Sequence, residues 1–383
     1  MASRSRVDPD GLIAAWLLGL LGTAGMFYVN VMPAIVAGLR DSLGYTNRQA
    51  GYVAAANVYG AAVGALCAVF LVRRVAWRRV EVAALVLLIL LDAASTLVVS
   101  PPLLVALRAL DGLFGGVSVG IALAVMARTR LPQRAYGAQF TLQLLLGGLG
   151  LMWLPQLAAH HGAYVLFLAL GTISALTLAL LALLPEYPLE IASKSRPDGS
   201  TIRLPLAATL VALFSFQAAN MGLFAFIFPL AHFYGLQTGF ISNTLGVADW
   251  AAAAGSLLAM WTGSRFGRLK PLGIVLLLTI LATFALLRSD VALVFIAANV
   301  ASGIAWSFVV PCLFSMCAAF DPTGRSASLG GFFSKLGLGS GPLLAPFVIG
   351  ANRYPLLVYV SIITIVATML ATAWPALRLD RAR

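Results

Sequence analysis

The sequence has few charged residues for its length. Only 10% of its 383 residues are Asp, Glu, Lys or Arg, whereas 61% are hydrophobic. A soluble protein carries about 25% charged residues, which it needs to cover its surface. Most of the outer surface of this protein must therefore face something other than water, and a soluble fold is excluded.

Residue types that carry catalysis or bind metals are also scarce. The chain has three cysteines, Cys67, Cys312 and Cys317, and they stand in no metal or redox spacing. The sequence shows no nucleotide-binding motif, no catalytic triad and no metal-ligand pattern. We therefore expect no enzymatic activity, no cofactor and no metal, and we assign the cysteines to helix packing.

Long apolar runs, in contrast, recur along the whole chain between short polar or Pro/Gly breaks. Crossing the hydrocarbon core of a membrane takes about 20 apolar residues in a helix, and continuous runs of this kind are not typical of a β-barrel. The sequence predicts an all-α membrane protein. The twelve predicted spans are residues 11–33, 47–70, 80–99, 103–126, 136–158, 162–184, 205–231, 240–262, 272–287, 291–319, 328–350 and 355–376.

The basic residues are distributed unevenly between the two sides of these spans. Of the 25 lysines and arginines, 19 lie on the side of the N-terminus and four on the other side, while Arg108 and Lys335 lie within spans. Because cytoplasmic loops are rich in Lys and Arg, we predict that both termini are cytoplasmic in a bacterial inner (plasma) membrane. The net charge of +12 follows from this bias and indicates no nucleic-acid partner.

The two halves of the chain resemble each other. An offset of 191 residues aligns small and basic positions from the second predicted span of each half through the fifth. The aligned pairs are Gly64 with Gly255, Arg74 with Arg265, Gly112 with Gly303, Arg134 with Arg325, Gly148 with Gly339, and Gly150 with Gly341. Six spans per half give both copies the same orientation, as in transporters built from parallel repeats.

This repeat predicts three parts of the chain. We expect an N-terminal six-helix bundle at residues 1–184, a cytoplasmic linker at 185–204 and a C-terminal six-helix bundle at 205–383. The linker prediction depends on the prolines, glycine and charges between Pro185 and Arg203. No part is long enough for a separate soluble domain, so the function is expected within the membrane.

The loop after the eighth predicted span reads SRFGRLKPL, from Ser264 to Leu272, and the matching loop of the first half reads RRVAWRRV, from Arg73 to Val80. The first resembles the Asp-Arg-x-Gly-Arg-Arg/Lys signature of the major facilitator superfamily. The matching positions are Arg265, Gly267 and Arg268, with Arg74 in the degenerate copy. The signature's acid is missing, since Ser264 and Arg73 take its place. In the family that acid helps to hold one conformation closed.

Three glycine-rich stretches strengthen the resemblance. The fourth predicted span carries RALDGLFGG from Arg108, similar to an Arg-x-x-x-Gly pattern of the family. The fifth and eleventh carry GGLG from Gly147 and GLGSGP from Gly337, similar to a Gly/Pro-rich helix of many members, exporters in particular. The resemblance implies two rocking six-helix bundles around a central cavity, lined by the first, second, fourth and fifth helix of each bundle.

Ionisable residues in a membrane span need a partner or a purpose, because each costs about 2.5–3.5 kcal/mol at a helix centre. We count five. Asp92 and Arg108 lie about eight residues either side of a tight turn, at similar depth, and Asp111 follows Arg108 by three residues. These three form either a structural ion-pair triad or a cavity site in which Arg108 meets substrate and the two acids serve protons.

The other two ionisable residues lie in the second half. Asp249 stands in the eighth predicted span with no basic residue within one turn, on a stripe of small and polar residues. We interpret it as a proton or substrate-amine site, with a buried structural acid as the alternative. Lys335 lies on a glycine stripe of the eleventh span. It suits an anionic ligand or a carboxylate partner such as Asp249.

Uncharged polar and aromatic residues complete the expected cavity. Each alone is more often a packing or helix–helix hydrogen-bonding residue, but together they describe a polar, aromatic-rich site for a small ligand. With Lys335 and Arg108, the predicted substrate-binding residues are Tyr28, Asn30, Asn57, Tyr59, Gln143, Gln217, Asn220, Trp250, Asn299 and Trp306.

The sequence thus predicts a secondary active transporter that moves a small organic solute by alternating access, with protons as the coupling ion. Lys335 and Arg108 favour an organic anion such as a carboxylate. The alternatives are a proton-driven exporter of drugs or other amphipathic compounds, and a membrane sensor or scaffold that transports nothing. We expect a monomer whose partners are its solute, protons and the lipid bilayer.

Overall fold

The computed structural model describes residues 7–71, 75–187, 203–262, 266–320 and 325–381. Throughout these residues the secondary structure is helical, without a strand. The chain divides into two compact units, Met1–Ser193 (unit 1) and Lys194–Arg383 (unit 2), and the division falls inside the predicted linker. The all-α class is confirmed.

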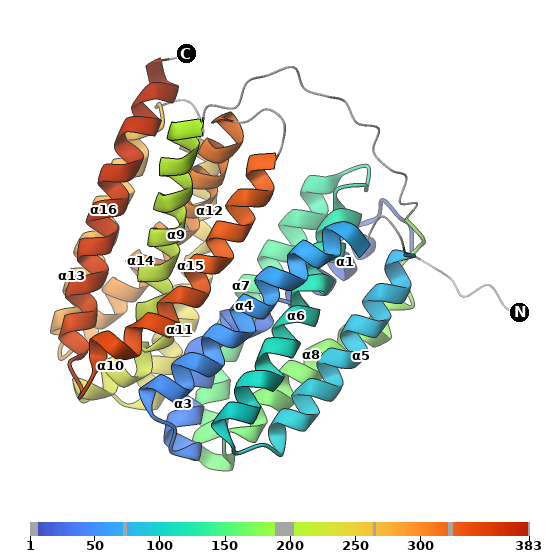
Figure 1. Ribbon diagram of the computed structural model, residues 1–383, viewed down its shortest axis with the longest axis horizontal. Helices are drawn as coiled ribbons and strands as arrows, with labels where there is room; N and C mark the ends of the chain where they lie inside the picture. The colour runs from blue at the N-terminus through green and yellow to red at the C-terminus, as the bar shows by residue number, and fades with distance from the viewer. Residues whose placement is uncertain (1–6, 72–74, 188–202, 263–265, 321–324, 382–383) are drawn as a thin grey trace, which may run out of the picture. The chain divides into compact units, whose positions relative to one another are not determined.

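Unit 1 consists of eight helices in its described part, which run lengthwise beside one another (Figure 1). They are α1 (Leu12–Ala24), α2 (Phe27–Asn30), α3 (Met32–Leu43), α4 (Asn47–Leu71), α5 (Trp77–Thr96), α6 (Pro101–Met126), α7 (Pro132–His161) and α8 (Tyr164–Leu181).

Unit 2 has the same style of packing in the residues that are described. Its helices are α9 (Arg203–Ala225), α10 (Ile227–Phe233), α11 (Thr238–Ala251), α12 (Ala253–Thr262), α13 (Leu269–Ala285), the short 3-10 turn η1 (Leu286–Arg288), α14 (Ala292–Phe320), α15 (Arg325–Ile349) and α16 (Tyr354–Arg381).

Three predicted spans are interrupted in the structure, so their prediction as single helices was wrong. The first span becomes α1, α2 and α3, and it extends to Leu43 rather than ending at residue 33. Pro33 lies at the start of α3, where its missing N–H is tolerated. The seventh span is divided at Phe226, just before Pro229, which cannot donate to the carbonyl four residues earlier. The eighth span is divided at Ala252, and neither α11 nor α12 contains a proline.

Among the described residues, nine helices are long and apolar enough to cross a membrane. The other three predicted spans correspond to α1–α3, to α5 and to the pair α11 and α12. The number of twelve crossings stays a prediction. Large apolar side chains such as Met260 (73% exposed) and Leu370 (68%) lie on the outside of their units, as expected for helices in lipid.

The internal repeat has a structural counterpart in helix packing. A side chain on Gly64 would overlap the carbonyl oxygen of Leu113, and one on Gly255 would overlap that of Ile304. Both partners are again 191 residues apart. Because only glycine allows so close an approach of two backbones, α4 packs on α6 as α12 packs on α14.

Candidate functional site

The predicted charge cluster of unit 1 is assembled. Arg108 Nη1 on α6 lies 2.7 Å from Asp92 Oδ1 on α5 and 3.3 Å from Asp111 Oδ2, one turn further along α6. Arg108 Nη2 donates to Ser95 Oγ at 2.6 Å and to the Leu91 carbonyl at 3.0 Å. The predicted ion pair between adjacent helices is confirmed.

This cluster is closed to solvent. Arg108 is 0% exposed, Asp92 2% and Asp111 5%. Asn57 of α4 donates to Asp111 Oδ2 at 2.8 Å, and the Arg108 guanidinium lies 5.0 Å from the centre of the Phe167 ring of α8. The triad therefore joins four helices of unit 1. A role of these residues in binding substrate or protons stays a prediction.

A second polar group in unit 1 connects α2 to α7. Asn30 Nδ2 donates to the Gln143 carbonyl at 3.1 Å, and Gln143 Nε2 donates to Asn30 Oδ1 at 3.2 Å. Tyr28 donates its hydroxyl to the Val53 carbonyl of α4 at 3.4 Å and is buried, while Tyr59 of α4 is partly buried. The pairing of Asn30 with Gln143 was not predicted, although both residues were selected.

In unit 2 the polar residues converge on α15. Gln217 of α9 donates through Nε2 to Ser334 Oγ at 2.8 Å, and its Oε1 accepts from the indole N–H of Trp306 of α14 at 2.8 Å. Gln217 and Ser334 are buried, with 1% and 6% exposed. One glutamine thus joins three helices directly beside Lys335, the residue after Ser334.

Two predicted site residues are satisfied within their own helices. Asn220 donates to the Phe216 carbonyl and Asn299 to the Phe295 carbonyl, each at 2.8 Å and four residues back. Both side chains keep an oxygen that can accept a further hydrogen bond. Their assignment to a substrate site stays a prediction.

Lys335 differs from the charges of unit 1 because nothing neutralises it. It is partly buried in the middle of α15, and among the described residues it forms no ion pair and no hydrogen bond. Gly331, four residues earlier on the same face, has open space where a side chain would begin. The structure therefore offers a cation with room beside it.

Asp249 is also unpaired. It lies in α11, three residues before the interruption at Ala252, and is partly buried. Its Oδ2 is inaccessible to solvent and has no hydrogen-bond partner within the described chain. The expected pair of Lys335 with Asp249 is not formed in this structure. The neighbouring Trp250 is 39% exposed.

The loop motif is described only in part. Arg74 and Arg265 lie outside the described residues. Gly267 has a φ of 73°, which favours glycine, and a side chain there would meet the Asp380 carboxylate of α16. Asp380 accepts hydrogen bonds from the backbone N–H groups of Arg268 at 2.8 Å and Leu269 at 3.0 Å. The signature's acid is missing from this loop, and Asp380 of the last helix binds the backbone where the loop leads into α13.

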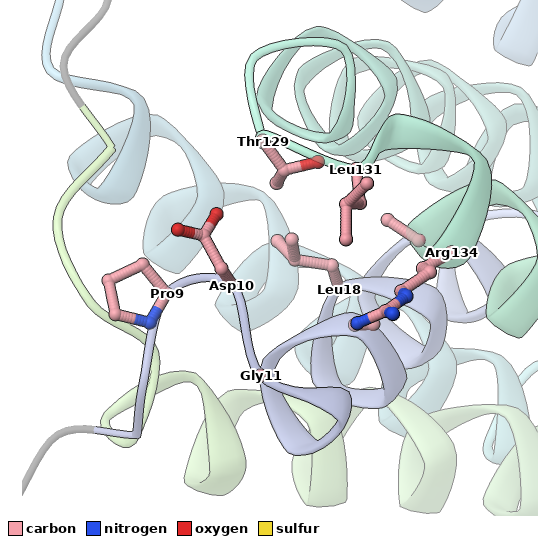
Figure 2. Close-up of a pocket in the computed structure, with 9 residues that line it drawn as sticks. Pro9, Asp10, Gly11, Leu18, Thr129, Leu131 and Arg134 are labelled. Carbon is pink, nitrogen blue, oxygen red and sulfur yellow. The ribbon is translucent and has the colours of Figure 1, made fainter.

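A small, shallow hollow lies at the end of unit 1 where α1 begins. Figure 2 shows Asp10, Gly11 and Arg134 among its lining residues. Asp10 pairs with Arg130 at 3.2 Å. None of the predicted substrate residues lines this hollow, and we assign no function to it.

Three residues with strong contacts were missed by the sequence analysis: Glu81, Ser334 and Asp380. Glu81 stands one residue inside a predicted span, two residues after the exposed basic residue Arg79. In the structure it is 0% exposed and accepts a hydrogen bond from Ser118. Ser334 and Asp380 had no distinguishing pattern in the sequence.

Three solved structures with a similar fold are each under 25% identical to the chain, so they show the fold alone. The nucleoside transporter NupG has a TM-score of 0.76 at 12% identity, covering 94% of this chain and 98% of that one. The D-xylose–proton symporter gives 0.69 at 14%, covering 94% and 96%. The human organic anion transporter MFSD10 (TETRAN) gives 0.65 at 17%, covering 94% and 98%.

A search of curated protein sequences finds no significant match. The sequence model of the Major Facilitator Superfamily, in contrast, matches residues 16–346, which is most of the chain. Together with the helical repeat and the lipid-type surface, this match identifies a multi-pass membrane protein with a transporter fold. The chain belongs to the major facilitator superfamily.

Proposed function

We propose that the protein is a secondary active transporter that moves a small organic anion, such as a carboxylate, by alternating access with proton coupling. Lys335 is the observation that carries this proposal. It is a cation in the middle of a membrane helix, and it has no partner in the described chain. Asp249 supplies a candidate proton site in the same unit.

An unpaired lysine in a membrane helix is expensive and marks a functional site by default. The compact ammonium group binds carboxylate and phosphate oxygens as a point charge with three donors. The open space beside Gly331 leaves room for a ligand on the same face of α15. A bound anion would replace the missing counter-ion of Lys335.

The hydrogen bonds around Ser334 give Lys335 a defined position. Gln217 of α9 donates to Ser334, and Gln217 is itself held by the indole N–H of Trp306 of α14. Side chains on Gly337 and Gly341 would collide with the backbone of α9. Because α15 is held this tightly on both sides of Lys335, the ammonium group is presented by a rigid element, as a selective binding site requires.

Asp249 suits proton exchange because its carboxylate has neither a cation nor a hydrogen-bond donor in the described chain. A carboxyl group in such surroundings changes its charge as its exposure to water changes, and acids of this kind serve as proton relays in transporters. The interruption of the helix at Ala252 lies less than one turn away. The D-xylose–proton symporter shows that the shared fold supports proton coupling.

Transport by purified protein in proteoliposomes tests the proposal. We expect accumulation of one or more carboxylates from a panel when the pH gradient is imposed. Lys335→Met should reduce anion uptake at least tenfold, while Lys335→Arg should retain part of it. Normal anion uptake by Lys335→Met would refute the anion site, and the absence of any solute flux would indicate a sensor or scaffold.

Asp249→Asn separates coupling from binding. It should abolish pH-driven accumulation and leave solute counterflow, which moves no net protons, at the wild-type rate. Asp290→Asn is a matched control, because this acid of the same unit is exposed and pairs with Arg288. Unchanged pH-driven uptake by Asp249→Asn would place proton coupling elsewhere.

The second candidate function is proton-driven export of amphipathic compounds. The helices α7 and α15 contain internal prolines, Pro155 in the first and Pro342 and Pro346 in the second, next to their glycine stretches. Asp249 without a cation would suit an amine as well as a proton. Efflux of cationic dyes that depends on Asp249 but not on Lys335 would favour this function over anion transport.

A further inference from the structure

Glu81 is a buried acid for which the proposed transport cycle has no role. It lies four residues into α5 and is 0% exposed. Its Oε1 accepts a hydrogen bond from Ser118 Oγ of α6 at 2.5 Å. Its Oε2 is inaccessible to solvent and has no hydrogen-bond partner within the described chain.

The surroundings of this carboxyl are largely apolar, apart from the buried indole N–H of Trp77, which has no hydrogen-bond partner within the described chain. Trp77 and Leu85, one turn before and after Glu81 on α5, belong to the hydrophobic core of unit 1. Val117 and Ile121, which flank Ser118 on α6, belong to the same core. The hydroxyl of Ser118 is therefore the polar side-chain group that contacts Glu81 in the described structure.

The helices packed against α5 bring no cation to Glu81. These helices are α6 and α8. The segment Tyr164–Leu181 of α8 contains no Asp, Glu, Lys, Arg or His. On α6 the charged residues are Arg108 and Asp111, which lie about 15 and 10 Å along the axis from Ser118 and belong to the triad.

The charges of α5 itself are also directed elsewhere. Arg78 donates to the Leu181 carbonyl at 2.7 Å and pairs with Glu186 at 2.9 Å. Arg79 is exposed, and Asp92 pairs with Arg108. No described side chain forms an ion pair with Glu81.

An ionised carboxylate buried without a counter-ion is far less stable than the neutral acid. Glu81 is therefore neutral in this conformation. Because Oε1 accepts from Ser118, the proton resides on Oε2. The neutral acid leaves one neutral O–H donor unsatisfied, whereas the ionised form would leave a full charge with a single hydrogen bond.

We propose that Glu81 is a second proton-binding site of this protein, filled in the present conformation and emptied when water reaches Oε2 between α5 and α6. On release the Oε2–H bond breaks, its electron pair stays on the carboxylate, and the proton passes to water as hydronium. Trp77, the first residue of α5, is about 6 Å from Glu81 along the helix axis. The predicted topology places this end of α5 at the cytoplasm, so exchange would be with that side.

Infrared spectroscopy of the purified full-length protein tests the site without any solute. Glu81→Gln should remove a carbonyl band of a protonated carboxylic acid at neutral pH. Ser118→Ala should shift this band to higher frequency, because Oε1 loses its hydrogen bond. In the wild type, the band should decrease as the pH is raised while the protein stays folded and monodisperse.

Two spectroscopic outcomes would overturn the proposal. If Glu81→Gln removes no carboxylic-acid band, Glu81 is ionised and the site is not filled. If the band is assigned to Glu81 but persists at every pH at which the protein is folded, the residue is a permanent structural acid. Glutamine has nearly the size of glutamate and can still accept from Ser118, and monodispersity of the variant checks its folding.

Use of this proton in transport is the part that depends on the proposed function. Glu81→Gln should then lower the number of protons moved per solute by one and preserve counterflow. An unchanged proton-to-solute ratio would exclude Glu81 from coupling, even if Asp249→Asn abolishes it. Failure of the wild type to couple protons at all would refute the proposed function, whereas the infrared result on Glu81 would stand.

Discussion

The two units differ in whether the charged residues within their predicted membrane spans form ion pairs. In unit 1, Arg108 is neutralised by Asp92 and Asp111 and is 0% exposed. In unit 2, Lys335 and Asp249 have no ion pair in the described chain, and neither is paired with the other. A cluster of paired opposite charges is compatible with a structural role, whereas an unpaired charge costs stability and is expected to be retained for what it binds. The difference predicts a structural role for the triad of unit 1 and a binding role for Lys335 and Asp249 of unit 2.

The largest expected effect comes from breaking the ion-pair triad of Arg108, Asp92 and Asp111. Arg108→Met should lower the free energy of unfolding by about 3–5 kcal/mol, because it leaves two acids buried without their cation. Thermal unfolding in detergent measures this. Arg134→Met, which removes an exposed arginine of the same unit, is the matched control and should change little.

A compensating variant sharpens this prediction. Replacing the whole triad, with Asp92→Asn and Asp111→Asn added to Arg108→Met, should recover most of the lost stability because no buried charge remains. A single Arg108→Met variant as stable as the wild type would mean that the triad does not hold unit 1 together.

The next effect concerns a contact between two helix ends that occurs in both units, made by a basic side chain in unit 1 and by an acidic one in unit 2. In unit 1, Arg78 at the start of α5 donates to the carbonyl of Leu181 at the end of α8. In unit 2, Asp380 at the end of α16 accepts from the N–H groups of Arg268 and Leu269 at the start of α13. Each charge interacts favourably with a helix dipole, because Arg78 lies at the C-terminus of α8 and Asp380 at the N-terminus of α13.

Removing either side chain should therefore destabilise its own unit by a similar amount. We expect about 2 kcal/mol for Arg78→Ala and for Asp380→Ala, the range of hydrogen bonds to charged groups. Arg381→Ala is the control beside Asp380. Limited proteolysis at the two loops distinguishes the units, and equal cleavage of wild type and Asp380→Ala after α12 would contradict the role of Asp380.

A smaller effect of opposite sign is expected for the unpaired charges. Lys335→Met and Asp249→Asn should leave the thermal stability unchanged or raise it by about 1 kcal/mol, because each removes an uncompensated charge from a partly buried site. Lys335→Met is nevertheless expected to lose anion uptake, and Asp249→Asn to lose pH-driven accumulation. A drop in stability like that of Arg108→Met would show that Lys335 has a structural partner.

Much of this contrast was visible in the sequence. The shared depth of Asp92 and Arg108 predicted their ion pair, and the offset of 191 residues predicted equivalent packing of Gly64 and Gly255. Both are local or periodic signals, which follow from helix geometry. Lys335 and Asp249 were selected because apolar spans make a charge conspicuous.

The rest depended on contacts that no pattern encodes. Glu81 was missed because its burial is decided by α6 and α8, not by its own neighbours in the chain. The link from Gln217 to Ser334 and the contact of Asp380 with Arg268 connect residues more than 100 positions apart. The interruption at Phe226 has a local signal in Pro229, whereas no proline in α11 or α12 marks the interruption at Ala252.

The smallest expected effect concerns the hydrogen bonds that connect the segment after α8 to the segment before α1. Tyr187 follows α8 and donates its hydroxyl to the Pro9 carbonyl at 3.0 Å, while the Val7 N–H donates to the Leu183 carbonyl at 3.2 Å. Burial, with a smaller contribution from Asp10 and Asp8, raises the pKa of Tyr187 to about 12. The phenol therefore stays neutral in the folded protein at a pH where the unfolded chain has lost this proton.

The sign of the pH dependence follows from this difference. Below pH 10 Tyr187 is neutral in both the folded and the unfolded state, and its contribution to stability is fully present. Between about pH 10 and about pH 12 only the unfolded state releases the proton, so the stability of the folded state falls. Tyr187→Phe should be less stable than the wild type by about 1 kcal/mol at pH 8. Its disadvantage should shrink as the pH rises through this window. If the stability of the two proteins changed in parallel with pH, the Tyr187 hydroxyl would not be buried against Pro9. The hydrogen bond between them would then not stabilise the end of unit 1.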